Sequence, residues 1–410
     1  MPSAPRILIS TGELSGDYHA SNLVRAIRKQ APDTVFLGIG SHNMKSAGVE
    51  ILHDSTDWGG IGVFSSLLKA PEIYRIGRNF IRQIPELDLD LIIVVDYRVF
   101  HAAILKGVRH LEIKKLYYFA PVRWPGFEPF RLGKLYSSLL ANLKHINPHL
   151  GRETKNRFDA LSELADKLIL AYPLSIDEYK KAGADVEFLG HPLMNVVHAT
   201  KSKEQVRTEL GLNDKSKLIG ILPGSREHEL RLHLPVLKKV IAGLKSNFDD
   251  LHFYIPIAHP DHKNKIHYYL GDQSRGIKFV SGDDYNILNA SDLVLSKTGT
   301  SVQVLMALGV PTVAFYTILS SLWYNISIRL FARYEHIAFP NVLAGKRIIP
   351  EFIQDDFKSD KILECAVKLL KDDQARKKMS LELLKIRDQL YKPDALEKAA
   401  SIAIEMATKK

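Results

Sequence analysis

Short runs of β-branched and other apolar residues alternate with helix-length amphipathic segments, and this alternation constrains the fold more than any other feature of the chain. A first series of runs, typical of buried parallel strands, lies at residues 6–10, 35–38, 89–95, 115–119 and 167–171. A second series lies at residues 218–222, 253–257, 277–280, 293–295 and 312–315. Parallel strands need helical crossovers, so each series predicts its own sheet built from βαβ units. We therefore expect an α/β chain with two Rossmann-like, doubly wound parallel-sheet domains.

The length of the chain also favours two domains, because 410 residues exceed what one hydrophobic core usually supports. A polar stretch at residues 201–204 separates the two series, which places a boundary near residue 195. We predict domains at residues 1–195 and 196–380. Residues 381–410 are predicted to form a C-terminal helical segment that packs back on the first domain.

Composition narrows the cellular setting and the class of partner. The single cysteine, Cys365, excludes an internal disulfide and a cysteine-based zinc cluster, and it fits a reducing compartment. No apolar run reaches the 18 residues that a membrane span needs, so we expect a cytoplasmic protein, soluble or bound to a membrane surface. The net charge of +10 favours anionic partners such as nucleotide phosphates or lipid headgroups. Neither a zinc-finger spacing nor an RNA-binding strand pattern is present, so no nucleic-acid partner is predicted.

Three strand-to-helix turns suggest anion binding. The first, directly after the first strand, contains Gly12, Glu13, Ser15, Gly16 and Asp17. Glycines there allow close approach of a ligand, and the next helix offers N–H groups to an anion. A tight turn without a ligand explains the same spacing equally well.

The second domain contains two further turns of this kind. Gly224, Ser225 and Arg226 follow one strand, and Thr298, Gly299 and Thr300 follow another. A guanidinium beside a helix start suits a diphosphate because it forms bidentate hydrogen bonds and is permanently charged. An arginine on a solvated helix start is the alternative interpretation.

Two single residues complete the list of candidates. Asp96 ends an apolar strand, where a carboxylate could accept a proton from an attacking hydroxyl. Asn341 lies in a polar turn among apolar residues, where it could contact phosphate, although helix capping is the commoner role.

These residues resemble the lipid-A-disaccharide synthase family over nearly the whole chain. The segments that carry the resemblance are Gly12–Asp17, Val95–Asp96, Leu222–Arg226 with Glu229, Ala290–Asp292, Thr298–Thr300, Leu308–Pro311 and Pro340–Gly345. The resemblance implies a GT-B architecture, with the two domains facing each other across a cleft. It also implies an inverting glycosyltransferase that joins UDP-2,3-diacylglucosamine to 2,3-diacylglucosamine 1-phosphate, giving a β-1,6-linked disaccharide and UDP.

The resemblance assigns a role to each candidate residue. Asp96 would be the catalytic base, and the turn at residues 12–17 would bind the phosphorylated acceptor. The UDP-sugar would contact Gly224, Ser225, Arg226, Thr298, Gly299, Thr300, Gln303 and Asn341. No metal and no cofactor are implied. The implied partners are the two acylated glucosamine substrates and the cytoplasmic surface of the inner membrane, and a homodimer is left open.

Three departures from the family pattern affect these assignments. After Asp96 the family continues with Pro, a second Asp, Phe and Asn, whereas this chain has Tyr97 and, five residues after Asp96, His101, an alternative base. Val304 stands where the family has a Glu resembling a ribose-binding acid, with Gln303 adjacent. Roughly twenty residues at 127–148 have no counterpart in the family.

Two stretches bear on a lipid substrate. Residues 72–84, with Ile73, Phe80 and Ile84 on one face and arginines elsewhere, show the pattern of a membrane-surface helix or of ordinary core packing. Residues 319–331 are aromatic and apolar but too short to span a bilayer.

Two functions of other classes compete with the transferase. A UDP-sugar 2-epimerase would share the fold and the UDP site, and a non-catalytic nucleotide- or lipid-binding relative would tolerate the departures.

Overall fold

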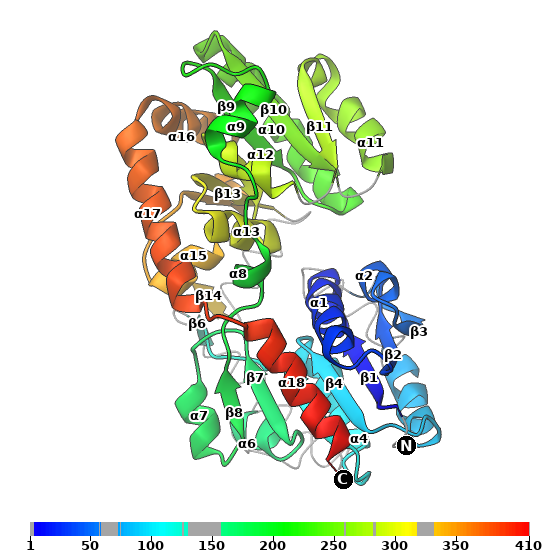
Figure 1. The fold of residues 1–410 in the computed structure, drawn as a ribbon. Helices are drawn as coiled ribbons and strands as arrows, with labels where there is room; N and C mark the ends of the chain where they lie inside the picture. The colour runs from blue at the N-terminus through cyan, green and yellow to red at the C-terminus, as the bar shows by residue number, and fades with distance from the viewer. Residues whose placement is uncertain are drawn as a thin grey trace, which may run out of the picture. The chain divides into compact units, whose positions relative to one another are not determined.

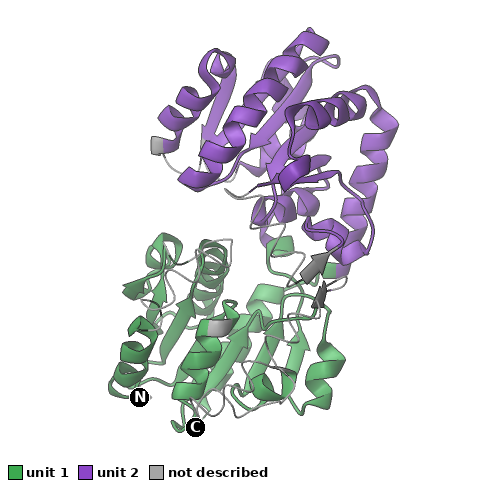
Figure 2. Ribbon diagram, turned by 180° about the vertical axis from the view of Figure 1, so that it is seen from behind, with its two compact units in different colours: residues 1–123, 153–195, 390–410 green, residues 124–152, 196–389 purple. Residues whose placement is uncertain are grey.

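The computed structural model describes residues 4–56, 58, 73, 75–124, 127–129, 157–257, 260–281, 284–317 and 332–409. The chain forms two compact units (Figure 2). Unit 1 comprises residues 1–123, 153–195 and 390–410, and unit 2 comprises residues 124–152 and 196–389. The C-terminal segment that we predicted at 381–410 is therefore divided between the units at residue 390.

In the described part of unit 1, seven parallel strands form one sheet in the order β3-β2-β1-β4-β5-β7-β8 (Figure 1). The strands are β1 (Arg6–Thr11), β2 (Val35–Gly40), β3 (Glu50–Asp54), β4 (Leu91–Val95), β5 (Lys114–Tyr118), β7 (Lys167–Leu170) and β8 (Val186–Phe188). The helices are α1 (Leu14–Gln30), α2 (His42–Ser46), η1 (Ile84–Glu86), α4 (Arg98–Gly107), α6 (Arg157–Ser162), α7 (Ile176–Lys181), α8 (Leu193–Val196) and α18 (Ala395–Thr408).

The last helix of the chain helps to build the core of unit 1. Helix α18 lies beside α1 (Figure 1), and Ala399, Ala400 and Ala403 are fully buried in the same apolar cluster as Ile7 and Ile93. Alanine side chains let two helices approach closely while still removing apolar surface from water. Residues from the two ends of the chain therefore share one core.

The stretch at 72–84 packs into unit 1 and is not a membrane-surface helix as far as its described residues show. Ile73, Phe80 and Ile84 are buried. A Cβ on Gly77 would lie 2.9 Å from the Phe100 ring of α4, so the helix through residues 75–83 contacts α4 closely. Its apolar face therefore belongs to the core, which is the second of the two interpretations that we weighed.

In the described part of unit 2, six parallel strands form a second sheet in the order β11-β10-β9-β12-β13-β15. The strands are β9 (Lys217–Leu222), β10 (Leu251–Ile257), β11 (Ile277–Ser281), β12 (Leu293–Lys297), β13 (Thr312–Tyr316) and β15 (Glu351–Ile353). The helices are α9 (Lys203–Glu209), α10 (Glu227–Asn247), α11 (Pro260–Leu270), η3 (Gly271–Ser274), α12 (Tyr285–Ala290), α13 (Thr300–Leu308), α15 (Phe339–Ala344), η4 (Gln354–Asp356), α16 (Ser359–Lys371) and α17 (Asp373–Leu390).

A short antiparallel pair accompanies this sheet. Strand β6 (Phe127–Pro129) pairs with β14 (Ala332–Tyr334). The remainder of the predicted insertion, residues 130–148, and the apolar stretch at 319–331 lie outside the described residues.

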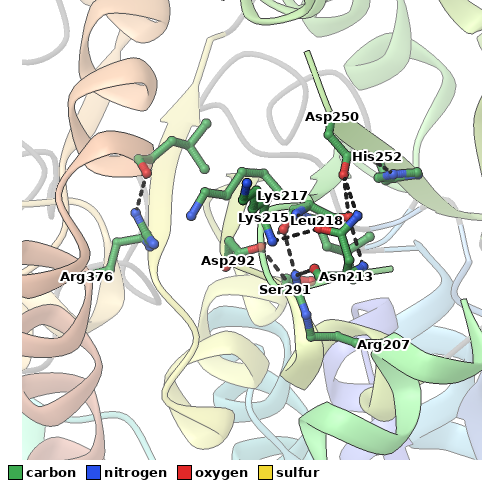
Figure 3. A network of polar contacts seen from close by, with 12 residues as sticks. Arg207, Asn213, Lys215, Lys217, Leu218, Asp250, His252, Ser291, Asp292 and Arg376 are labelled. Carbon is green, nitrogen blue, oxygen red and sulfur yellow. Dashed lines mark hydrogen bonds and ion pairs between the residues drawn. The ribbon is translucent and has the colours of Figure 1, made fainter. Parts of the chain in front are cut away.

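A polar network closes the N-terminal edge of the unit 2 sheet (Figure 3). Asp292 accepts hydrogen bonds from the Leu218 backbone N–H (2.8 Å) and from Arg207 Nη1 (3.1 Å). The Ser291 hydroxyl, in turn, lies 2.8 Å from that of Tyr254. The segment Ala290–Asp292 thus holds β9, β12 and α9 together at the edge away from the strands' carboxyl ends.

Each sheet has one point where the strand order reverses. In unit 1 the chain runs outward through β1, β2 and β3 and then returns to place β4 beside β1. In unit 2 it runs through β9, β10 and β11 and returns to place β12 beside β9. Ligands of doubly wound sheets bind outside the carboxyl ends of the strands at such switch points. The turns after β1, β4, β9 and β12 are therefore where a site is expected.

Candidate active site

Asp96 is an exposed carboxylate on an unusual backbone at the switch point of unit 1. It follows β4 directly, and both Asp96 (φ 52°) and Tyr97 (φ 45°) adopt the left-handed conformation. Two consecutive non-glycine residues in this region cost about 1–3 kcal/mol each and persist only where their surroundings enforce them.

The backbone carbonyl of Asp96 is fixed by two buried side chains. The Tyr117 hydroxyl donates to it at 2.9 Å, and His101 Nδ1 lies 2.6 Å from it. His101 Nε2 lies 3.0 Å from the hydroxyl of Ser10 in β1. Because a carbonyl can only accept, His101 carries its proton on Nδ1 and accepts from Ser10 at Nε2. These contacts hold the strained turn and leave the Asp96 carboxylate facing solvent.

His101 is therefore unsuited to be the base. It has no exposed surface, and both ring nitrogens are engaged. Burial lowers the pKa of His101 to about 4, against a smaller opposing contribution from its bond to the Asp96 backbone, so the ring is neutral at physiological pH. It acts on the site only through the position of Asp96.

Surrounding protein raises the pKa of Asp96, while a hydrogen bond from the Tyr97 backbone N–H opposes the change. The carboxylate is nevertheless exposed, so water screens it and the rise is smaller than full burial would cause. Desolvation, and then the charge of Glu13, also raise the pKa of Tyr97. An exposed carboxylate with a raised pKa has the properties of a general base.

The turn at residues 12–17 packs against the Tyr97 ring and leaves no open space for a ligand at Gly12. A Cβ on Gly12 would lie 2.1 Å from the Tyr97 ring, so this ring occupies the space that we expected a ligand to approach. Gly16 is buried, whereas Glu13 and Ser15 are half-buried. The turns after β1 and β4 are thus brought together, with Glu13 and Ser15 as the accessible polar residues of the first.

Asp17 has a structural role, which corrects its prediction as an acceptor-binding residue. Its side chain is fully buried, and its carboxylate accepts from three backbone N–H groups at the start of α2. These donors are Ser41 (2.6 Å), Asn43 (3.0 Å) and Met44 (3.3 Å). A carboxylate on a helix start satisfies N–H groups that have no partner within the helix. Asp17 therefore joins α1 to α2 and cannot reach a substrate.

At the switch point of unit 2, the turn after β9 is organised by Glu229. Gly224 has φ 125°, and a Cβ there would lie 2.4 Å from Glu229 Oε2, so only glycine fits. The same oxygen accepts from the backbone N–H groups of Ser225 (3.0 Å) and Arg226 (3.3 Å). Ser225 is exposed and Arg226 half-buried. Among the described residues, the Arg226 guanidinium has no hydrogen-bond or ion-pair partner, so it is available to an anion.

Glu229 also reaches the turn after β12. Its Oε1 lies 2.9 Å from Lys297 Nζ, and the two side chains are 3% and 14% exposed. Burial alone would raise the pKa of Glu229, but Lys297 and the Ser225 N–H outweigh it, so the pKa is lowered and the residue is charged. This ion pair joins the two turns of the switch point.

The turn at 298–300 has the geometry of a ligand-binding helix start. Gly299 is exposed and has φ 136° with ψ −152°, a conformation that side chains exclude, and it precedes α13 directly. Thr298 is buried, with its N–H bonded to the Phe315 carbonyl at 2.8 Å. Thr300 is half-buried at the first turn of α13. The groups of this turn that a ligand can reach are therefore the Thr300 side chain and the exposed backbone of Gly299.

The two residues at the expected ribose position differ in environment. Val304 packs against the apolar cluster that contains Leu305 and Val294. Gln303, its neighbour, is half-buried. A carboxylate at position 304 would meet apolar side chains, which fits the valine found there.

Asn341 is structural, which corrects its prediction as a UDP-binding residue. It is fully buried, and its amide oxygen accepts from the backbone N–H groups of Ile348 (2.7 Å) and Ile349 (3.0 Å). Its amide nitrogen donates to the Ile349 carbonyl at 2.9 Å. All of its contacts stabilise the loop after α15.

Sequence reasoning included Lys297 in the turn after β12 without giving it a role, and it did not single out Tyr117 or Ser10 as parts of the site. A signal existed for a role of Lys297, because a lysine that ends a buried strand is unusual unless it is paired. Tyr117 and Ser10 had no such signal, because a tyrosine or serine in a buried strand is an ordinary residue.

Comparison with known proteins resolves the family. The family profile described as lipid-A-disaccharide synthetase matches residues 7–143 and 142–406. The chain belongs to the lipid-A-disaccharide synthase family. The lipid-A-disaccharide synthase of Geobacter metallireducens is 30% identical over 414 residues, covering 100% of both chains. That of Nitrosococcus oceani is 30% identical and covers 95% of this chain and 93% of its own. This family member is accordingly a glycosyltransferase of lipid A biosynthesis.

Solved structures confirm the predicted GT-B fold. A putative UDP-N-acetylglucosamine 2-epimerase from Listeria monocytogenes has a TM-score of 0.60 at 13% identity, covering 99% of this chain and 98% of its own. The glycotransferase of kitacinnamycin has a TM-score of 0.61 at 12% identity, covering 99% and 100%. At these identities the likeness shows the fold alone. The family match, not the fold, therefore distinguishes this synthase-family chain from an epimerase.

Proposed function

We propose that the chain transfers 2,3-diacylglucosamine from UDP to 2,3-diacylglucosamine 1-phosphate. The acceptor's 6-hydroxyl attacks the anomeric carbon, the bond to UDP breaks, and the product is a β-1,6-linked disaccharide 1-phosphate. A direct displacement of this kind inverts the anomeric configuration. The observation that carries the proposal is the exposed Asp96 carboxylate on its enforced left-handed turn, in a chain of this family.

Each unit contributes one part of the reaction in this proposal. In unit 1, Asp96 removes the proton of the 6-hydroxyl, and the half-buried Glu13 and Ser15 lie on the turn packed beside it. In unit 2, Arg226 and the turn at 298–300 hold the diphosphate, with Gly224 shaping the Arg226 turn. The departing phosphate gains negative charge, which the guanidinium stabilises. Gln303, half-buried on α13, contacts the nucleotide.

We place the protein at the cytoplasmic surface of the inner membrane, where acylated substrates reside. No helix within the described residues is long and apolar enough to cross a bilayer. The net charge of +10 would favour an anionic surface. Sedimentation with anionic vesicles, and its loss at high salt, tests this placement, and light scattering tests for a homodimer.

The function is tested by incubating purified protein with UDP-diacylglucosamine, with and without the monosaccharide phosphate. Disaccharide and UDP should form only when both substrates are present. An epimer formed without acceptor would support the 2-epimerase instead, and the stereochemistry of the disaccharide tests inversion.

Asp96→Asn then tests the base. Asparagine tolerates the left-handed backbone and keeps the side-chain shape, so turnover should fall about 10² to 10⁴-fold while UDP affinity stays near that of the wild type. Asp88→Asn is the matched control, because Asp88 is also an exposed aspartate with positive φ (49°). Wild-type turnover in Asp96→Asn would remove Asp96 from proton transfer.

A further inference from the structure

Lys297 places a second cation at the switch point of unit 2. It is the last residue of β12, and its side chain is only 14% exposed. Its ammonium lies 2.9 Å from Glu229 Oε1 and 3.4 Å from the position that a Cβ on Gly299 would occupy. Gly299 is exposed and has no side chain, so it does not block a ligand at the start of α13 from reaching the ammonium.

The charges around this ammonium make it suited to phosphate. Glu229 caps the Ser225 and Arg226 N–H groups, so the start of α10 offers these two donors to Glu229 rather than to a ligand. Glu229 also brings a buried negative charge to the site, which would repel a diphosphate. The Lys297 ammonium lies between the Glu229 carboxylate and Gly299, so its positive charge offsets this repulsion. Its N–H groups that do not bond Glu229 are then available to a ligand at the turn 298–300. The Tyr316 ring, 6.0 Å from the ammonium, limits its movement on another side.

We propose that Lys297 binds the diphosphate of the sugar nucleotide directly, and that Glu229 is its positioning residue. The inference rests on the proposed UDP site in unit 2 and adds a ligand-binding residue to it. A lysine in this position supplies a fixed positive charge beside Arg226. The diphosphate is then held by two cations from the two turns that the Glu229 contacts join.

Calorimetric titration with UDP and with uridine tests the proposal. Lys297→Met should weaken UDP binding roughly ten- to hundred-fold, the size of a charge-assisted hydrogen bond, and leave uridine binding unchanged. Lys297→Arg keeps the charge and should retain most of the UDP affinity. Equal loss for UDP and uridine would overturn the proposal, because it would indicate a general disturbance of the site.

The double variant Lys297→Met/Glu229→Gln distinguishes direct contact between Lys297 and phosphate from neutralisation of the Glu229 charge alone. It leaves no uncompensated buried charge, so it also guards against a Lys297→Met protein that fails to fold. If Lys297 contacts phosphate, the double variant still binds UDP more weakly than the wild type, because removal of the Glu229 charge relieves repulsion but does not replace the lost contact. Recovery of wild-type UDP affinity would overturn direct contact. A wild-type protein that binds no UDP would instead refute the proposed function, a result distinct from any of these.

Discussion

Replacement of Asp17 by asparagine should separate a structural role from acceptor binding. In the folded protein, Asp17 Oδ1 accepts from Ser41 and Met44, and Oδ2 accepts from Asn43. Asparagine can keep the two bonds at the oxygen, but its amide nitrogen would then face the Asn43 N–H as one donor against another. The buried negative charge at the start of α2 is also lost.

The expected cost follows from these losses. One charge-assisted hydrogen bond contributes about 1.5–3 kcal/mol, and a charge at a helix start adds about 0.3–1 kcal/mol. The sum is roughly 2–4 kcal/mol. For a unit of this size, each kcal/mol lowers the melting temperature by about 2–4 °C, which gives a decrease of roughly 4–16 °C in the transition of unit 1.

Differential scanning calorimetry measures this decrease, and disaccharide formation at low temperature measures the Michaelis constant for the acceptor. Asp33→Asn is the control, because Asp33 is exposed in the same unit and its replacement should leave the melting temperature unchanged. A wild-type melting temperature combined with a raised acceptor constant would refute the structural assignment and restore Asp17 to the acceptor site.

Two further outcomes are expected. Arg226→Ala should weaken UDP binding by about 1.5–3 kcal/mol, with the exposed Arg231→Ala as control, and unchanged affinity in calorimetric titration would exclude Arg226 from the diphosphate site. Burial lowers the pKa of both His19 and His101 from 6.5 to about 4. Between pH 6.5 and 4 these histidines therefore bind protons in the unfolded chain but stay neutral in the folded chain. Stability should therefore fall as pH drops from 6.5 toward 4, by at most about 3 kcal/mol for each histidine. Urea midpoints measured across this range test the trend, and His101→Asn, in which the amide nitrogen replaces Nδ1–H as donor, should reduce the slope.

The central strands could be predicted from sequence because both of their faces are buried. β1, β4, β9 and β12 each contain a largely apolar run, and all four were predicted within two residues at each end. β3, β8 and β15 were missed. They are short, lie at or near sheet edges and carry polar residues such as Glu50, so their sequences show no apolar run.

The candidate site was predictable to the level of its turns. Residues that follow β1, β4, β9 and β12 meet at switch points by topology alone, so Asp96 and Thr298–Thr300 could be located in advance. The roles of individual side chains could not. An acid after a glycine-rich turn can equally bind a ligand or cap a neighbouring helix, and only the position of α2 shows that Asp17 does the latter.

The packing of α18 on α1 determines the order in which the protein can be completed during synthesis. Unit 2 has all of its residues once residue 389 has been added, whereas unit 1 still lacks Ala399, Ala400 and Ala403. The first half of the nascent chain must therefore wait, with apolar surface uncovered near Ile7 and Ile93, until the last helix leaves the ribosome. A fragment that ends after unit 2 would retain all of unit 2 but expose the core of unit 1, so the chain cannot be divided at residue 195 into two independently folding halves.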